Sequence, residues 1–216
     1  MLGGAATHFA LSASLFDEVN VVGPVGDDFG DAELAVLGTR GTNLDDVERV
    51  AGGKTFFWAG EYHWDMNSRD TLDTQLGVFE TFAPKLSATS RAAEVLFLAN
   101  IQPSLQLDVL EQMDGPRFTA LDSMDLWINI ARDDLVKVIE RVDCLILNDA
   151  EIRMLTGKPS LVAAANELLA MGPSVVIAKQ GEYGAVAISA DTYFSLPAFP
   201  LETVVDPTGA GDTFAG

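Results

Sequence analysis

The clearest chemical pattern lies at the end of the chain, where residues 206–216 read DPTGAGDTFAG. The proline restrains φ, and the glycines allow the backbone to approach a ligand closely. If a helix begins in this run, the N–H groups of Gly209, Ala210 and Gly211 would face an anion, with the helix dipole behind them. These three residues are therefore candidates for an anion hole.

The same run places a carboxylate, Asp212, in the first turn of that expected helix. A carboxylate there would repel a bound anion, but it could accept a proton. A hydroxyl held between Asp212 and a phosphoryl group would lose its proton as the new O–P bond forms, and the backbone donors would stabilise charge on the transferring group. The alternative is an ordinary helix start with a favourable acidic residue. A bare GxGD favours that alternative, whereas the full run favours catalysis.

Polar residues follow several short apolar runs that we expect to be strands. The runs cover residues 95–99, 118–121, 144–147 and 175–178, and they end at Asn100, Asp122, Asn148 and Lys179. Near-continuous apolar runs are typical of strands buried on both faces. Ligands of open parallel sheets bind at the carboxyl ends of the strands, so these four residues should line one edge. Each could instead cap a helix or start a turn.

Helix candidates alternate with these strands, over residues 103–113, 133–142, 150–155 and 161–171. This alternation predicts an α/β fold with a mostly parallel central sheet flanked by helices. Earlier in the chain we expect a helix over 5–15, a strand over 19–22, a helix over 31–37 and a small β-rich lid over approximately 42–80. A late hairpin is expected over 184–196.

Composition excludes several classes of protein. The chain has 216 residues, with 13 Lys+Arg against 32 Asp+Glu and a net charge of −19, so we expect no nucleic-acid partner and no membrane surface. One cysteine, Cys144, excludes an internal disulfide framework and is expected to be a buried, inert thiol. No apolar run is long enough to span a membrane. No basic segment precedes residues 2–15, so we expect no signal peptide and a cytoplasmic protein.

The run at 206–216 resembles the C-terminal signature of the PfkB family of ribokinase-like carbohydrate and nucleoside kinases. The resemblance implies a ribokinase-like fold, Asp212 as the catalytic base and the three residues before it as its anion hole. It also implies ATP as the co-substrate. Asp206 and Thr208 match positions near a monovalent-cation site in some members, which makes K⁺ a candidate.

Two internal segments are similar to further motifs of the family. Residues 148–151, NDAE, resemble the NxxE motif, in which Asn148 and Glu151 help to place Mg²⁺, often through water. Mg²⁺ keeps several waters and uses few protein carboxylates, which fits this role. An ordinary capping box has the same spacing. Residues 179–184, KQGEYG, resemble the nucleotide loop, so Lys179, Gly181 and Gly184 are candidates for nucleotide binding. A simple hairpin turn is the alternative.

The N-terminal segment resembles the family's sugar-side signature. Gly3, Gly4 and His8 are candidates for acceptor binding, together with Asp122. His8 stands where the family commonly has Asn, which suggests a different acceptor, and a purely structural histidine is the alternative. By resemblance, the lid over 42–80 would close over the acceptor and exclude water, and it is a candidate surface for a homodimer.

The predicted function is ATP-dependent transfer of the γ-phosphoryl group to an alcohol of a sugar or sugar-like substrate. The alternatives are a nucleoside kinase of the same family and a catalytically inactive fragment that binds nucleotide or sugar. A dinucleotide-dependent oxidoreductase is disfavoured, because no GxGxxG follows the first strand. The sugar-side signature at Gly3 and Gly4 lies at the very start of the chain, and the expected base, Asp212, lies close to its end. We therefore expect one domain over 1–216 that is incomplete at both termini, inactive alone and marginally stable.

Overall fold

The computed structural model describes residues 2–216, which form two compact units. The N-terminal unit contains the chain up to residue 91, together with 203–214 and 216. The sheet unit contains residues 92–202 and 215. None of the helices described is long and apolar enough to cross a membrane.

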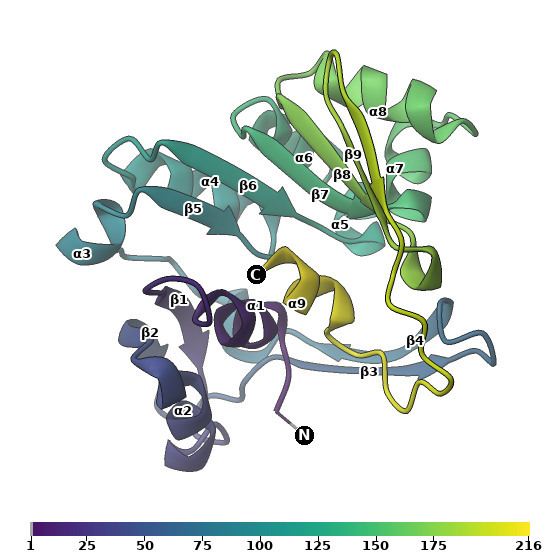
Figure 1. The fold of residues 1–216 in the computed structure, drawn as a ribbon. Helices are drawn as coiled ribbons and strands as arrows, with labels where there is room; N and C mark the ends of the chain where they lie inside the picture. Colours follow the sequence, from purple (N-terminus) through teal and green to yellow (C-terminus); the bar gives the residue numbers. More distant parts are fainter. Residues whose placement is uncertain (1) are drawn as a thin grey trace. The chain divides into compact units, whose positions relative to one another are not determined.

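The sheet unit is built on one six-stranded sheet (Figure 1). Its strands lie in the order β10-β9-β8-β7-β6-β5. They are β5 (Val95–Leu98), β6 (Phe118–Asp122), β7 (Cys144–Asn148), β8 (Val175–Lys179), β9 (Ala185–Ile188) and β10 (Tyr193–Leu196). Strands β5 to β8 are parallel, and β9 and β10 continue the sheet as an antiparallel hairpin. The predicted parallel sheet and late hairpin are therefore confirmed.

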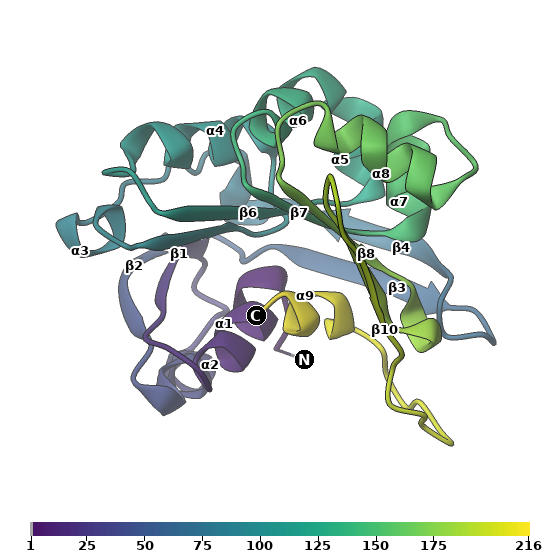
Figure 2. The ribbon, with the colours of Figure 1, turned by 45° about the horizontal axis from the view of Figure 1, so that its top comes forward.

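The helices of the sheet unit lie together on one side of its sheet (Figure 2). They are α4 (Pro103–Gln112), α5 (Asp125–Ile130), α6 (Arg132–Ile139), α7 (Asp149–Thr156) and α8 (Leu161–Leu169), and a 3₁₀ turn, η3 (Gly181–Tyr183), follows β8. Four of the five helices match the predicted ones within three residues at either end. Helix α5 was not predicted, because its six residues are too few to show a helical period.

Both faces of the central strand β7 are buried, as its apolar sequence predicts. Along β7, Leu145 and Leu147 join the main core under the helices, whereas Cys144 and Ile146 belong to a second cluster with Ala120. Burial raises the pKa of the Cys144 thiol to about 11. A thiol with this pKa remains protonated near neutral pH and is a poor nucleophile, in agreement with the expected inert role.

The N-terminal unit begins with a small α/β segment. Its elements are α1 (Ala5–Ala13), β1 (Asn20–Val25), α2 (Asp31–Leu37), the 3₁₀ turn η1 (Gly38–Arg40) and β2 (Asn43–Arg49). Strands β1 and β2 pair in parallel as a two-stranded sheet. Ala10, Val21 and Leu37 form a small buried cluster, to which α1, β1 and α2 each contribute one residue.

A separate hairpin follows, and we call residues 57–75 the lid hairpin. It consists of β3 (Phe57–Tyr62) and β4 (Arg69–Gln75), which pair with each other in an antiparallel sheet of two strands. The 3₁₀ turn η2 (Gly77–Glu80) and the short helix α3 (Ala88–Arg91) come next, and α9 (Ala210–Ala215) ends the chain. Within the predicted lid range of 42–80, residues 43–49 pair with β1, whereas 57–75 form the hairpin.

Candidate functional site

The run at 206–216 folds as a loop that opens helix α9, as expected. Gly209 is the N-cap residue and has a φ of 76°, a left-handed conformation that favours glycine. Asp206 stabilises the loop, because its Oδ1 accepts a hydrogen bond of 2.9 Å from the N–H of Thr208. Hydrogen bonds from the Thr208 hydroxyl and N–H lower the pKa of Asp206, and the positive potential of His8 adds to this effect. Asp206 is therefore ionised near neutral pH.

The backbone donors of this loop differ in their availability. The Ala210 N–H already donates to the carbonyl of Pro207 at 3.1 Å. Within residues 2–216, the N–H groups of Gly209 and Gly211 donate to no acceptor. Asp212 lies in the first turn of α9, directly after these two donors. Two of the three predicted anion-hole groups are thus free to bind an anion beside a carboxylate.

His8 and Gly209 lie in contact, although they are far apart in the sequence. A Cβ atom added to Gly209 would lie 2.3 Å from Cδ2 of His8, which is much shorter than an ordinary contact. The imidazole therefore occupies the space that any larger residue at 209 would need. The two segments that the sequence analysis assigned to the acceptor and to the anion hole meet at this point, within the N-terminal unit.

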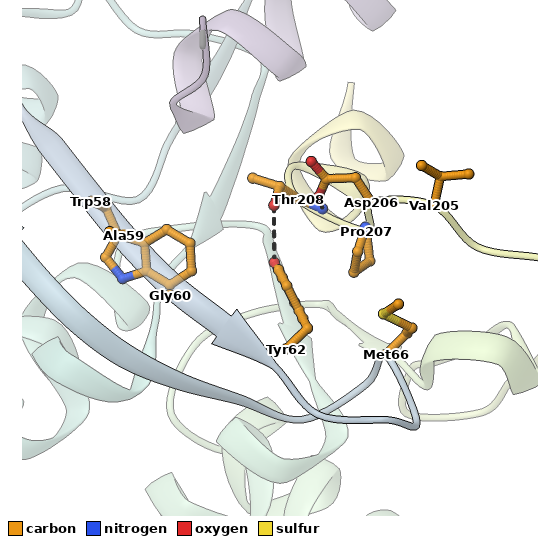
Figure 3. Close-up of a pocket in the computed structure, with 9 residues that line it drawn as sticks. All are labelled: Trp58, Ala59, Gly60, Tyr62, Met66, Val205, Asp206, Pro207 and Thr208. Atoms are coloured by element: carbon orange, nitrogen blue, oxygen red, sulfur yellow. Dashed lines mark hydrogen bonds between the residues drawn. The ribbon is translucent and has the colours of Figure 1, made fainter.

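A pocket of about 410 Å³ lies between the lid hairpin and the loop before α9 (Figure 3). Its lining residues are Trp58, Ala59, Gly60, Tyr62, Met66, Val205, Asp206, Pro207 and Thr208. The hydroxyl oxygens of Thr208 and Tyr62 are hydrogen-bonded at 3.4 Å, which links the two sides of the pocket. The wall thus combines apolar surface from Trp58, Met66 and Pro207 with a few polar groups, a composition typical of small-molecule sites.

The tip of the lid hairpin is held by local hydrogen bonds. Asp65 accepts bonds from the N–H groups of Asn67 and Ser68, at 3.2 and 3.1 Å. Met66, which lines the pocket, has a φ of 55°, the one positive φ of a non-glycine residue in the described chain. Such conformations cost free energy and persist where the surroundings impose them. The tip therefore presents Met66 to the pocket in a fixed geometry.

The glycines at the start of the chain leave open space. Gly4 is the N-cap of α1 and has a φ of 96°, while a Cβ added to Gly3 or Gly4 would meet no atom within 4 Å. Gly4 is therefore needed for its backbone conformation rather than for a close contact with this chain. The open space beside both glycines is compatible with the proposed acceptor contact.

At the carboxyl edge of the large sheet, Lys179 and Asp122 form an ion pair. The Nζ atom of Lys179 donates to Oδ2 of Asp122 at 3.0 Å, and only 16% and 4% of the two side chains are exposed. The sequence analysis assigned Lys179 to the nucleotide and Asp122 to the acceptor. The structure shows that these two residues contact each other. Asn100, at the end of β5, is bonded instead to the indole N–H of Trp127 at 2.9 Å.

Asn148 and Glu151 form a capping box at the start of α7. The Asn148 side chain accepts from the Glu151 N–H, and the Glu151 carboxylate accepts from the Asn148 N–H, both at 2.8 Å. The structure therefore shows the capping box that the sequence analysis gave as the alternative for these two residues. Glu151 is 6% exposed, and one of its carboxylate oxygens is used by the cap. This arrangement suits Mg²⁺ held through water better than direct chelation. No group of three His, Cys, Asp or Glu side chains suited to a metal occurs within residues 2–216.

The segment after β8 forms a closed turn. The N–H of Gln180 donates to the carbonyl of Gly184 at 2.8 Å. Gly181 and Gly184 both have positive φ, of 56° and 100°. A Cβ on Gly184 would lie 2.0 Å from the carbonyl oxygen of Leu196, so this glycine is required by the hairpin itself. The structure therefore shows the hairpin turn that the sequence analysis gave as the alternative, and Lys179 is the cationic residue of the segment.

The site residues divide between the two units. The N-terminal unit brings together His8, the loop 206–209 and the residues that begin α9, whereas the sheet unit holds Asp122, Asn148, Glu151 and Lys179. Sequence reasoning missed Tyr62 and Met66 as pocket residues. Aromatic clustering around the lid was visible in the sequence, but only the pairing of β3 with β4 shows which side chains face the loop.

Comparisons with known proteins agree on one family. The model described as "pfkB family carbohydrate kinase" matches residues 1–216. The chain is 32% identical to a cytidine kinase of Thermococcus kodakarensis, over all of this chain and 78% of that protein. It is 28% identical to a deoxyribokinase of Salmonella typhi, over 99% of this chain and 72% of that protein.

Solved structures of the ribokinase type have the same fold. An adenosine kinase from Sinorhizobium meliloti superposes with a TM-score of 0.81 at 22% identity, covering 99% of this chain and 68% of that one. A putative ribokinase II from E. coli, in complex with ATP and Mg²⁺, gives a TM-score of 0.80 at 22% identity, covering 98% and 72%. The fold is therefore ribokinase-like.

Proposed function

Because this chain belongs to the PfkB family of carbohydrate kinases, we propose that it transfers the γ-phosphoryl group of ATP to an alcohol on a sugar ring. Asp212 is the proposed base. It takes the proton of the acceptor hydroxyl as that oxygen bonds to phosphorus. The N–H groups of Gly209 and Gly211 are the proposed stabilisers of charge on the transferring group.

The observation that carries this proposal is the geometry of the loop before α9. Two unused N–H donors lie directly beside a carboxylate, at the start of a helix whose first residues the glycines hold in place. The first N–H groups of any helix lack an intrahelical acceptor, so it is the combination of these donors with an adjacent carboxylate that supports the proposal. An anion beside a proton acceptor is what phosphoryl transfer requires.

ATP with Mg²⁺ is the donor used in this family. Bound Mg²⁺ neutralises phosphate charge and orients the γ-phosphoryl group. Asn148 and Glu151 are the proposed residues that hold it through water, and Lys179, Gly181 and Gly184 are proposed for the nucleotide. A monovalent cation, K⁺, is proposed beside Asp206 and Thr208. The ionised carboxylate of Asp206 supports this cation site.

The proposed acceptor site is formed by Gly3, Gly4 and His8, with the lid hairpin closing over it. The acceptor is a free sugar or a nucleoside, and in either case the reacting group is an alcohol of the sugar ring. Two observations favour the nucleoside. The pocket beside Trp58 and Tyr62 offers flat aromatic surface on which a base could stack, and the cytidine kinase is the relative with the higher identity of the two named above.

The lid hairpin is also the proposed surface for a homodimer. Both of its strands are edge strands, since the hairpin forms a sheet of its own. Phe57, Trp64 and Leu72 are exposed on it, at 49%, 95% and 66%. Exposed apolar residues on an unpaired strand favour pairing with a second strand.

A screen of acceptors tests the function. The protein is incubated with ATP-Mg²⁺ and, separately, with ribose, deoxyribose, fructose, cytidine, adenosine and inosine, and ADP release is measured. The proposal expects one of the two acceptor classes to stimulate ADP release well above the rate without acceptor. ATP turnover that no sugar or nucleoside stimulates would contradict it. Stimulation by nucleosides alone would identify a nucleoside, rather than a free sugar, as the acceptor.

A further inference from the structure

The ion pair between Lys179 and Asp122 lies at the proposed nucleotide edge of the sheet unit. Lys179 ends β8 and Asp122 ends β6, with β7 between them. In the strand register Lys179 is opposite Asn148, and Asp122 is opposite Ile146 of the same strand. The pair therefore bridges the end of β7, next to the residue that caps α7.

Asp122 is held in place by several contacts. Its Oδ1 accepts a hydrogen bond of 2.8 Å from the N–H of Ser123. The side-chain amide of Gln106 donates to the backbone carbonyls of Ala99 and Asp122, at 2.9 and 3.3 Å. Gln106 itself is 1% exposed. The carboxylate thus has a fixed position, and it imposes that position on the flexible side chain of Lys179.

Stability alone does not account for this pair. Burying two charges costs solvation free energy that their attraction often fails to recover, and apolar residues of similar size are frequently as stable. An ammonium group carries three N–H donors. Within residues 2–216, Lys179 uses one of them, on Asp122. The remaining donors are available for oxygen atoms of a ligand at the strand edge.

We propose that Asp122 is a positioning residue that holds the Lys179 ammonium group for the phosphates of the donor nucleotide. This inference rests on the proposed function for the identity of the donor. It also gives Asp122 a role different from the acceptor contact suggested by its place in the sequence. Asp122 holds the ammonium group in a fixed orientation, and Lys179 contacts a phosphate oxygen while it retains its bond to the carboxylate.

The test is ATP-Mg²⁺ binding by titration calorimetry, without any acceptor, in variants with isosteric or conservative changes. Asp122→Asn and Lys179→Gln should each raise the Kd roughly tenfold or more, as expected for loss of a charged hydrogen bond. Lys179→Arg should bind nearly as the parent protein does. Lys158→Gln is the matched control, because Lys158 forms an ion pair with Glu167 at 3.1 Å that is 42% and 37% exposed. It should leave the Kd unchanged.

The double variant Asp122→Asn/Lys179→Gln separates positioning from a structural role. It removes both charges, and the two amide side chains can still form a hydrogen bond. Because no buried charge is left unpaired, misfolding from that cause is avoided. If the pair positions Lys179, the double variant regains thermal stability, binds ATP as weakly as Lys179→Gln alone, and shows no added effect of Asp122→Asn. Recovery of ATP affinity in the double variant would assign the pair to stability and overturn the inference.

Two further outcomes also overturn it. One is an Asp122→Asn variant with unchanged ATP affinity and a raised KM for the acceptor, which would restore the acceptor role. The other is a parent protein that binds no ATP-Mg²⁺. In contrast, tight ATP binding that depends on Lys179, in a protein that phosphorylates no acceptor, would contradict only the proposed function.

Discussion

The contact between Gly209 and His8 predicts that Gly209→Ala destabilises the N-terminal unit and displaces the anion-binding loop. Alanine in the left-handed conformation costs about 1–2 kcal/mol. The new Cβ would also lie 2.3 Å from Cδ2 and 2.4 Å from Nε2 of His8, so the imidazole must move. Strain from one overpacked methyl group adds roughly 1–3 kcal/mol. The expected loss is therefore about 2–5 kcal/mol in the free energy of unfolding.

Urea unfolding followed by far-UV circular dichroism measures this loss, and a double variant separates its two parts. His8→Ala opens the space that the alanine at 209 needs. Adding His8→Ala to Gly209→Ala should recover the steric part and leave about 1–2 kcal/mol from the backbone conformation. Turnover by Gly209→Ala should also fall, because the N–H donors of the anion-binding loop are displaced. A Gly209→Ala protein with parental stability and turnover would refute the reasoning.

Two further predictions concern helix capping and the lid. Asn148→Ala removes the side-chain cap of α7 and should cost about 1 kcal/mol of unfolding free energy, measured by urea titration; no change would mean that the cap is replaced by solvent. His63 donates to Asp70 at 3.0 Å, and this bond, followed by the charge of Asp70, raises the pKa of His63. The pair therefore stabilises the hairpin fully below the usual histidine pKa of about 6.5 and is lost as the pH rises through the raised pKa. NMR titration of His63 should show a lower pKa in Asp70→Asn than in the parent, and identical titrations would contradict this.

The sheet unit could be predicted well because its signals are local. Each buried parallel strand is a short apolar run, and each amphipathic helix between strands repeats its apolar residues with a helical period. Strand β7, with Leu145 and Leu147 on one face and Cys144 on the other, shows why: both faces are buried, so nearly every residue is apolar. The polar residue at its end, Asn148, marks the carboxyl edge of the sheet.

Other features depend on contacts between distant residues, which the sequence did not indicate. Strand β2 is rich in charged residues and shows no alternation of apolar and polar residues, so its sequence did not indicate that it pairs with β1. Asp122 and Lys179 are 57 residues apart, so their ion pair follows only from the strand order. Both looked like independent ligand contacts from the sequence. The same holds for Tyr62, whose bond to Thr208 depends on how the lid hairpin folds back on the loop.

The most direct test of the central claim compares Asp212→Asn with the parent protein in ATP affinity and in turnover of the best acceptor. Asparagine keeps the shape of the side chain but cannot take the proton. The proposed role predicts a fall in kcat of roughly 100- to 10,000-fold, with the Kd for ATP-Mg²⁺ almost unchanged. Turnover by Asp212→Asn within a few fold of the parent would contradict the claim that this carboxylate is the base.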